Sequence, residues 1–188
     1  MEHSQENEII HRIQSGDTHA FGVLYDAYIK DIYRFIYYKT HQKEVAEDLT
    51  SEVFTKAFEK LSSFSTDKGS FRPWLYQIAR NKVIDHYRTR KSSENIEDAW
   101  DIASNENQER DLEAKQMADQ LQEFLHLLTS DQRDIIVMRL WQDMSYKEIS
   151  EVLGKTETNC RASYARGVEK LRTLMPLALL VLFFSFQP

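Results

Sequence analysis

The most informative segment of the sequence is MSYKEISEVLGKTETNCRASYARGVEKLR, residues 144–172. Ser145 and Glu148 have the S-x-x-E spacing of a capping box, which predicts the start of a short helix. Gly154 can adopt a positive φ without penalty, and it is expected to end that helix. Thr156 then predicts the N-cap of a second helix. Two helices joined by a short turn with a glycine are typical of a helix-turn-helix.

In a helix-turn-helix, the second helix lies in the DNA major groove and its first residues meet the base edges. Asn159 and Arg161 have the donor and acceptor geometry to read adenine and guanine there. Arg166 and Lys170 lie farther along the helix, where they suit phosphate contacts. Taken alone, the segment fits a helical hairpin with solvated charges equally well. Cys160 is expected to be a small buried side chain rather than a reactive thiol.

A second informative segment, FRPWLYQIARNKVIDHYRTRK (residues 71–91), mixes aromatic and basic side chains. Phe71 must serve the core, and Trp74 and Tyr76 cannot both share its face. Exposed aromatic rings beside cations suit single-stranded DNA, because bases stack on the rings while Arg and Lys follow the backbone. The alternative is that these aromatic side chains only pack a small core.

Apolar side chains at spacings of three and four predict helices along the rest of the chain. Asp17 is the expected N-cap of a helix that carries Ala20 to Tyr28, and a second apolar stripe continues to Lys39. A further helix spans Glu44 to Leu61, and the turn-rich segment Ser62 to Ser70 predicts a loop. No strand-like alternation of useful length occurs, so the predicted fold class is all-α. Four more helices are expected at residues 111–128, 131–141, 146–153 and 157–174.

The chain has 188 residues and a net charge of −6, but its charges are unevenly distributed. Residues 71–91 and 155–172 are basic, whereas residues 93–123 are strongly acidic. Two basic segments indicate two contact surfaces for a polyanion. Low hydrophobicity with dense like charge predicts a flexible acidic linker. The expected parts are two small helical modules at 1–91 and 111–174, the linker at 92–110 and an apolar tail at 175–188.

The sequence offers no pattern typical of an enzyme. Its 6 histidines are scattered without an H-E-x-x-H pair, and no Gly-rich phosphate loop is present. We therefore expect no catalytic residues, no metal site and no cofactor. The polar N-terminus lacks the apolar run of a signal peptide, and the single cysteine allows no internal disulfide. These features favour a cytoplasmic location.

With these segments in hand, the chain resembles the extracytoplasmic-function (ECF) sigma factors of the sigma-70 family. AEDLTSEVFTKAF (residues 46–58) is similar to their polymerase-binding helix, and residues 71–91 to their helix that melts DNA and reads the −10 element. Residues 128–172 are similar to their −35-reading module. The resemblance implies a sigma factor that binds core RNA polymerase and directs promoter-specific transcription initiation.

The resemblance also implies site residues, together with a loop at 63–70 that frames a flipped −10 base. Core polymerase binding is expected at Asp48, Leu49, Glu52 and Phe54. Contacts with −10 DNA and melting are expected at Arg72, Trp74, Arg80, Asn81, Asp85 and Arg88. Contacts with −35 DNA are expected at Glu157, Thr158, Asn159, Arg161, Ala162, Arg166 and Lys170.

Three departures from the family pattern stand out. Ser163 replaces an expected cation and Lys155 fills a position that is usually apolar, which affects the −35 sequence that is read. The third is the apolar run LMPLALLVLFFSFQP (residues 174–188), which at about 14 apolar-dominated residues is shorter than the roughly 20 that span a bilayer. It can pack on the second module, meet a protein partner or rest at a membrane surface, and we favour protein contact. The implied partners are core RNA polymerase, promoter DNA and an anti-sigma factor, which can hold a sigma factor at the inner membrane.

One rival interpretation is a helix-turn-helix repressor or activator that binds duplex DNA without polymerase. It accounts for the C-terminal half of the chain. It does not explain the acidic helix at 44–61 or the aromatic-basic helix at 71–91.

Overall fold

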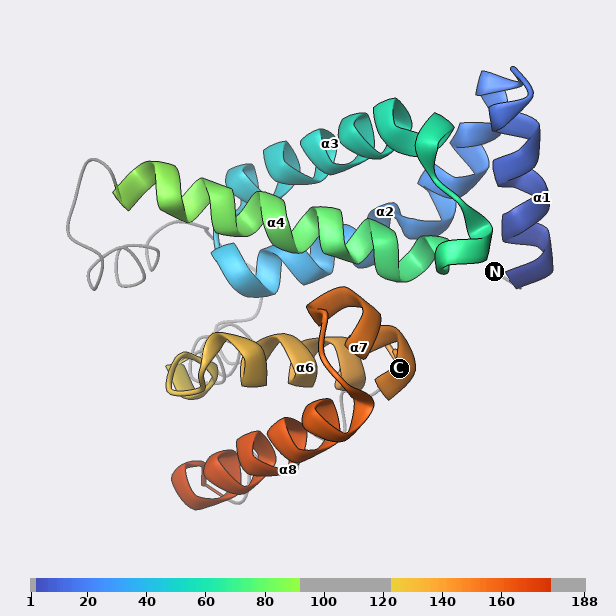
Figure 1. The fold of residues 1–188 in the computed structure, drawn as a ribbon. Helices are drawn as coiled ribbons and strands as arrows, with labels where there is room; N and C mark the ends of the chain where they lie inside the picture. Colours follow the sequence, from blue (N-terminus) through green and yellow to red (C-terminus); the bar gives the residue numbers. More distant parts are fainter. Residues whose placement is uncertain (1–2, 92–122, 177–188) are drawn as a thin grey trace. The chain divides into compact units, whose positions relative to one another are not determined.

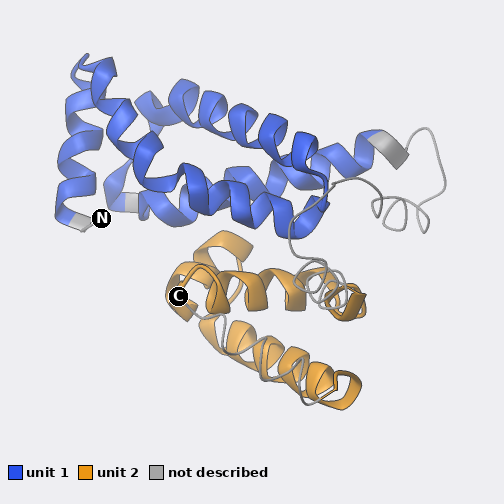
Figure 2. Ribbon diagram, turned by 180° about the vertical axis from the view of Figure 1, so that it is seen from behind, with its two compact units in different colours: residues 1–104 blue, residues 105–188 orange. Residues whose placement is uncertain are grey.

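The computed structural model describes residues 3–91 and 123–176. The chain divides into two compact units, residues 1–104 and 105–188, which are coloured separately in Figure 2. Every regular element of the described residues is helical, which confirms the predicted all-α class. None of these helices is long and apolar enough to cross a membrane. The expected acidic linker and the apolar tail beyond residue 176 lie outside the described residues.

The described part of unit 1 is built from four helices (Figure 1): α1 (His3–Gln14), α2 (Phe21–Thr40), α3 (Lys43–Lys60) and α4 (Phe71–Lys91). The helices α2, α3 and α4 each contact the other two, while α1 packs on α2. Short 3-10 turns connect them: η1 (Thr18–Ala20), η2 (Leu61–Ser63) and η3 (Thr66–Lys68). The predicted loop at 62–70 therefore contains two local turns.

The core of unit 1 is built from α2, α3 and α4, and two aromatic rings meet between α2 and α4. Phe35 and Tyr76 are fully buried, with ring centroids 5.2 Å apart in an edge-to-face arrangement. Tyr76 is thus a core residue. Of the two interpretations of the aromatic side chains in this helix, core packing and not DNA stacking is correct for Tyr76. Lys39 is only 3% exposed, and its Nζ lies 5.2 Å from the centroid of Phe35. Its stem extends the apolar stripe of α2 as predicted.

The helix α1 was not predicted from the sequence, because only a few apolar side chains mark it. Ile10 and Ile13 are buried, and Tyr28 of α2 donates a hydrogen bond to the buried carboxylate of Glu6. Burial raises the pKa of Tyr28 far above its usual range, and the bond to Glu6 raises it further. This buried hydrogen bond ties α1 to α2, and the two isoleucines bury one side of α1 in the unit.

Asp17 occupies the predicted N-cap position, because η1 follows it and runs directly into α2 at Phe21. Its side chain makes no capping hydrogen bond, however. Instead, Arg12 Nη2 donates to Asp17 Oδ2 at 2.6 Å. The hydrogen bond from Arg12 lowers the pKa of Asp17.

Unit 2 contains α6 (Ser130–Leu140), α7 (Tyr146–Leu153) and α8 (Glu157–Leu174), preceded by helical residues at 123–126. The start of the helix expected at 111–128 lies outside the described residues. Arg133 is buried and donates to the carbonyls of Leu125 (2.9 Å), His126 (3.3 Å) and Leu128 (3.4 Å). A single guanidinium thus binds carbonyls at and just beyond the end of the preceding helical residues, where carbonyls lack the full set of helical partners.

The helices α6 and α8 cross closely at Gly167. A Cβ atom at this position would lie 2.8 Å from Ile136 Cδ1 and 3.4 Å from Gln132 Cβ. The absence of a side chain therefore lets α8 approach α6, and this approach sets the position of α8 on the unit.

Candidate nucleic-acid interface

The helix-turn-helix of unit 2 forms at the residues that signalled it. Ser145 Oγ accepts from the Glu148 backbone N–H at 3.2 Å, and Glu148 Oε2 accepts from the Ser145 backbone N–H at 2.8 Å. Gly154 adopts the left-handed conformation, with φ 63° and ψ 36°. Thr156 Oγ1 accepts from the Asn159 backbone N–H at 3.2 Å. All three predicted helix ends are confirmed.

One side of α8 carries buried side chains, and the other side carries exposed ones. Cys160 and Leu171 are buried against the unit, as Ile149 and Val152 of α7 are. Burial raises the pKa of the Cys160 thiol, which agrees with its expected role as a small core side chain. The expected −35 residues are all exposed: Glu157, Thr158, Asn159, Arg161, Ala162, Arg166 and Lys170.

Arg161 is held by neighbours that the sequence did not reveal. Its Cζ lies 4.6 Å from the centroid of the Tyr146 ring, and its Nη2 lies 3.6 Å from Glu157 Oε2. Arg139 Cζ lies 5.4 Å from the same ring. The first residue of α7 therefore orients a guanidinium of α8, and no sequence periodicity connects positions 146 and 161.

Other cations of this unit also make internal contacts. Lys155 forms an ion pair with Asp131 of α6, which explains a cation at a position where an apolar residue was expected. Lys170 Nζ donates to the Leu127 carbonyl, and Arg166 Nη2 lies 3.3 Å from Ser163 Oγ. Any phosphate contact of Lys170 would therefore compete with, or add to, its bond within the unit.

In unit 1 the expected −10 residues fall on two sides of α4. Trp74, Asn81, Asp85 and Arg88 recur at intervals of three, four and seven residues and so share one side. Asn81, Asp85 and Arg88 are exposed, and Arg88 Nη1 lies 4.0 Å from Asp85 Oδ1. Arg72 lies on the opposite side, 6.0 Å from the centroid of Tyr76. Arg80 is half-buried between the two sides.

Trp74 packs against the loop that precedes α4. Its ring centroid lies 4.9 Å from that of Phe64 and 5.5 Å from that of Phe71. Phe64 stands between η2 and η3, so the structure brings Trp74 and the loop at 63–70 together. The Trp74 ring is half-buried, and part of its area is already used for packing.

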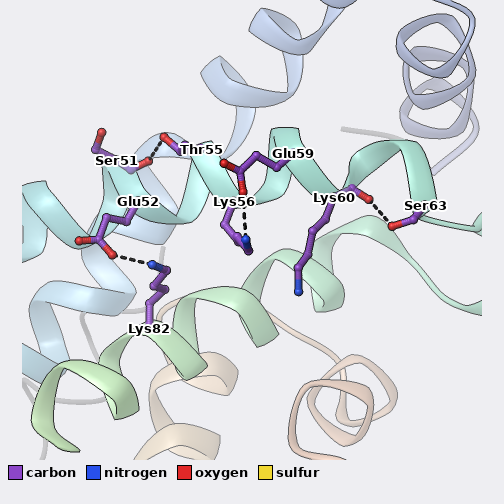
Figure 3. Close-up of polar contacts among 8 residues, drawn as sticks. All are labelled: Ser51, Glu52, Thr55, Lys56, Glu59, Lys60, Ser63 and Lys82. Atoms are coloured by element: carbon purple, nitrogen blue, oxygen red, sulfur yellow. Dashed lines mark hydrogen bonds and ion pairs between the residues drawn. The ribbon is translucent and has the colours of Figure 1, made fainter. Parts of the chain in front are cut away.

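The residues expected to bind polymerase separate into two groups on α3. Asp48 and Glu52 are exposed, and Glu52 Oε2 forms an ion pair with Lys82 Nζ of α4 at 2.6 Å (Figure 3). Leu49 and Phe54 are 5% and 3% exposed. These two apolar side chains hold α3 in the core, whereas the two acids lie on its exposed side.

Among the residues that the structure describes, no group of three His, Cys, Asp or Glu side chains lies close enough to hold a metal ion. The arrangement instead offers exposed cations, amides and one half-buried indole. These groups suit recognition of a polyanion with bases.

Comparison with known proteins identifies both units. The family description "Sigma-70 region 2" matches residues 24–93, and "Sigma-70, region 4" matches residues 118–171. The ECF RNA polymerase sigma factor BldN of Streptomyces coelicolor is 34% identical over 90% of this chain, which spans 65% of BldN and thus slightly less than two thirds of it. The ECF RNA polymerase sigma factor SigM of Bacillus subtilis is 30% identical over 80% of this chain and 92% of SigM.

Solved structures share the fold. CnrH, in complex with the cytosolic domain of CnrY, superposes with a TM-score of 0.72 at 23% identity, covering 90% of this chain and 96% of that one. The sigma factor RpoE, in complex with the anti-sigma factor NepR from Bartonella quintana, gives a TM-score of 0.66 at 22% identity, covering 82% and 95%.

Proposed function

Because the chain belongs to the ECF sigma factors of the sigma-70 family, we propose that this sigma factor binds core RNA polymerase and divides promoter recognition between its two units. Residues 1–91 would bind polymerase, read the −10 element and melt it. Residues 111–174 would read the −35 element, and residues 92–110 would link the two. The result is promoter-specific transcription initiation.

The observation that carries this proposal is the geometry of α8. Its exposed first turns present Asn159 and Arg161, while its other side is fixed by caps and buried side chains. A rigid helix that presents an amide and a guanidinium suits direct reading of major-groove base edges.

In unit 1, the shared side of α4 and the adjoining loop support the −10 role. Trp74 offers a partly exposed ring, and Asn81 and Arg88 offer polar groups along the same side. Stacking of a base on an aromatic ring contributes about 1–3 kcal/mol, comparable with the few kcal/mol needed to pull a base from the duplex. The loop at 63–70 would contact the flipped base.

Polymerase binding would use the exposed acids of α3, chiefly Asp48 and Glu52. The relative RpoE was solved with an anti-sigma factor, and we propose that this chain also binds one. A protein that works with RNA polymerase acts in the cytoplasm, and we propose that location. Sigma factors are generally recognition proteins, so we propose no catalysis by this chain.

The proposal is tested by transcription with purified core polymerase. We expect the chain to produce transcripts from a genomic DNA library, and the sequenced start sites to share −10 and −35 elements. Replacing Trp74, Arg80 and Asn81 with alanine should preserve closed complexes but abolish permanganate reactivity of unpaired thymines. Duplex binding without any polymerase-dependent transcript would instead support the repressor interpretation.

A further inference from the structure

The loop between α3 and α4 is tied to α1 by one side chain. Gln14, the last residue of α1, donates from Nε2 to the Leu61 carbonyl at 2.9 Å and to the Phe64 carbonyl at 2.8 Å. A primary amide carries two N–H donors, one for each carbonyl. These bonds join positions 47 and 50 residues apart in the sequence, so they fix the loop to a distant element.

The anchor itself is firmly placed. Ile10 and Ile13 are buried, α1 packs on α2, and Glu6 accepts a hydrogen bond from Tyr28. Gln14 therefore projects from a helix whose position is set by core contacts. Its amide can impose a geometry on the loop instead of following it.

Phe64 is the point where two restraints on the loop meet. Its carbonyl accepts from Gln14, its backbone N–H donates to Leu61 at 3.1 Å, and its ring packs on Trp74 and Phe71. The loop is thus fixed to α1 through its backbone and to α4 through a ring. Together these contacts fix the start of the segment that includes η3 and runs to Ser70.

We infer that Gln14 is a positioning residue for selection of the −10 base: it holds the loop at 63–70 in the conformation that receives that base. The inference rests on the proposed function of the loop. Gln14 itself does not need to touch DNA. Its effect would pass through the backbone carbonyls of Leu61 and Phe64. A substitution within the loop changes a side chain and leaves both carbonyls in place.

The test uses the full-length chain, alone and in holoenzyme. Gln14→Leu removes both donors while keeping the bulk, and Gln14→Glu replaces them with acceptors that repel the two carbonyls. Arg12→Gln is the matched control, because Arg12 lies on the same helix as Gln14. The substitution breaks the exposed ion pair with Asp17 and leaves the bonds to the loop in place. A variant with Thr66→Ala and Asp67→Ala alters the loop directly.

Two measurements separate the steps. Amide hydrogen exchange at residues 62–67 reports loop geometry without DNA, and we expect it to be about three- to tenfold faster in both Gln14 variants. Transcription from a library of −10 sequences reports base preference, which we expect to relax about two- to tenfold at the position the loop reads. Arg12→Gln should change neither.

Unchanged loop exchange in Gln14→Glu would overturn the inference. Faster exchange with unchanged base preference would also overturn it if the Thr66/Asp67 variant still alters preference, because the loop would then read DNA without help from Gln14. If the Thr66/Asp67 variant leaves preference unchanged as well, the proposed function of the loop is the part that fails.

Discussion

At the scale of single residues, the side chains proposed to meet DNA are already oriented by neighbours within the protein. Arg161 lies between the Tyr146 ring and the Glu157 carboxylate. A cation over an exposed ring gains about 0.5–1 kcal/mol, enough to bias a long flexible side chain toward one arrangement. Less ordering entropy is then lost when the guanidinium meets a base.

We predict that Arg161→Ala relaxes sequence preference at one or two positions of the −35 element. Loss of a base-reading contact costs about 1–3 kcal/mol at the base pair concerned. Affinity across a promoter library measures this effect. Arg139→Ala is the control, since Arg139 shares the Tyr146 ring but lies on α6. Equal weakening of every sequence by Arg161→Ala would show that α8 only positions the protein.

We also predict that Asp48→Arg combined with Glu52→Arg weakens binding to core polymerase, because both carboxylates lie on the exposed side of α3. Reversed charge pairs cost about 2–5 kcal/mol when they are buried in an interface. The measurement is the affinity of the folded variant for core polymerase.

The ion pair of Glu52 with Lys82 supplies the control for this prediction. An exposed pair contributes about 0–1 kcal/mol to folding, so Lys82→Ala should leave the fold and core affinity nearly unchanged. If Lys82→Ala weakens core binding as much as the double reversal, the ion pair and not the acidic surface is responsible.

At the scale of elements, the position of α8 depends on a glycine. Gly167 and Gly22 both lie within helices, yet only a Cβ at Gly167 would meet other atoms, 2.8 Å from Ile136 Cδ1. Alanine favours a helix over glycine by up to about 1 kcal/mol, whereas overpacking costs about 1–3 kcal/mol. The same substitution should therefore have opposite effects in the two units.

We predict that Gly22→Ala stabilises unit 1 by up to about 1 kcal/mol and that Gly167→Ala destabilises unit 2 by about 1 kcal/mol. Hydrogen exchange of core amides measures each unit separately. Stabilisation by Gly167→Ala would mean that Ile136 gives way without cost and that the crossing of α6 and α8 is loosely packed.

The same elements show what could be predicted from the sequence. Ser145, Gly154 and Thr156 act on backbone groups only a few residues away, so their signals are local and were confirmed. Asp17 also stands at its predicted N-cap position, but its carboxylate pairs with Arg12 and makes no capping hydrogen bond. Local patterns cannot rank two such partners.

Contacts between distant positions could not be predicted. The bonds from Gln14 to the loop and the stacking of Arg161 on Tyr146 depend on how helices pack, and neither has a periodic signature. Leu49 and Phe54 are a different case. Their helical spacing already places them on the apolar side of α3, and both are buried.

At the scale of the whole molecule, net charge is a poor guide to partners. The chain carries −6, yet residues 155–172 and 71–91 are basic. Salt screens charges beyond about 8–10 Å, so the attraction of a phosphate backbone depends on the cations close to it. The acids elsewhere contribute little at that distance.

We therefore predict that two substitutions, each of which removes one positive charge, affect DNA binding differently. Lys170→Ala should weaken binding to all promoter sequences alike and flatten the slope of log affinity against log salt by about one unit. Lys30→Ala, on α2, should leave the slope unchanged. Titrations of holoenzyme on promoter DNA from about 50 to 200 mM salt measure this.

Lys170 also donates to the Leu127 carbonyl, so its loss could weaken unit 2 itself. Core-amide exchange of unit 2 in Lys170→Ala separates the two effects. A flattened slope with unchanged exchange assigns the lysine to phosphate. An unchanged slope would leave only its role within the unit.

The division of labour within α7 and α8 also bears on how new specificities arise. The residues that build the scaffold, such as Ser145, Gly154 and Cys160, are not those that face outward, such as Asn159 and Arg161. After a gene duplication, the outward positions can drift without unfolding the copy. On the proposed function, a few codon changes on one side of this single helix would then give the copy a new regulon.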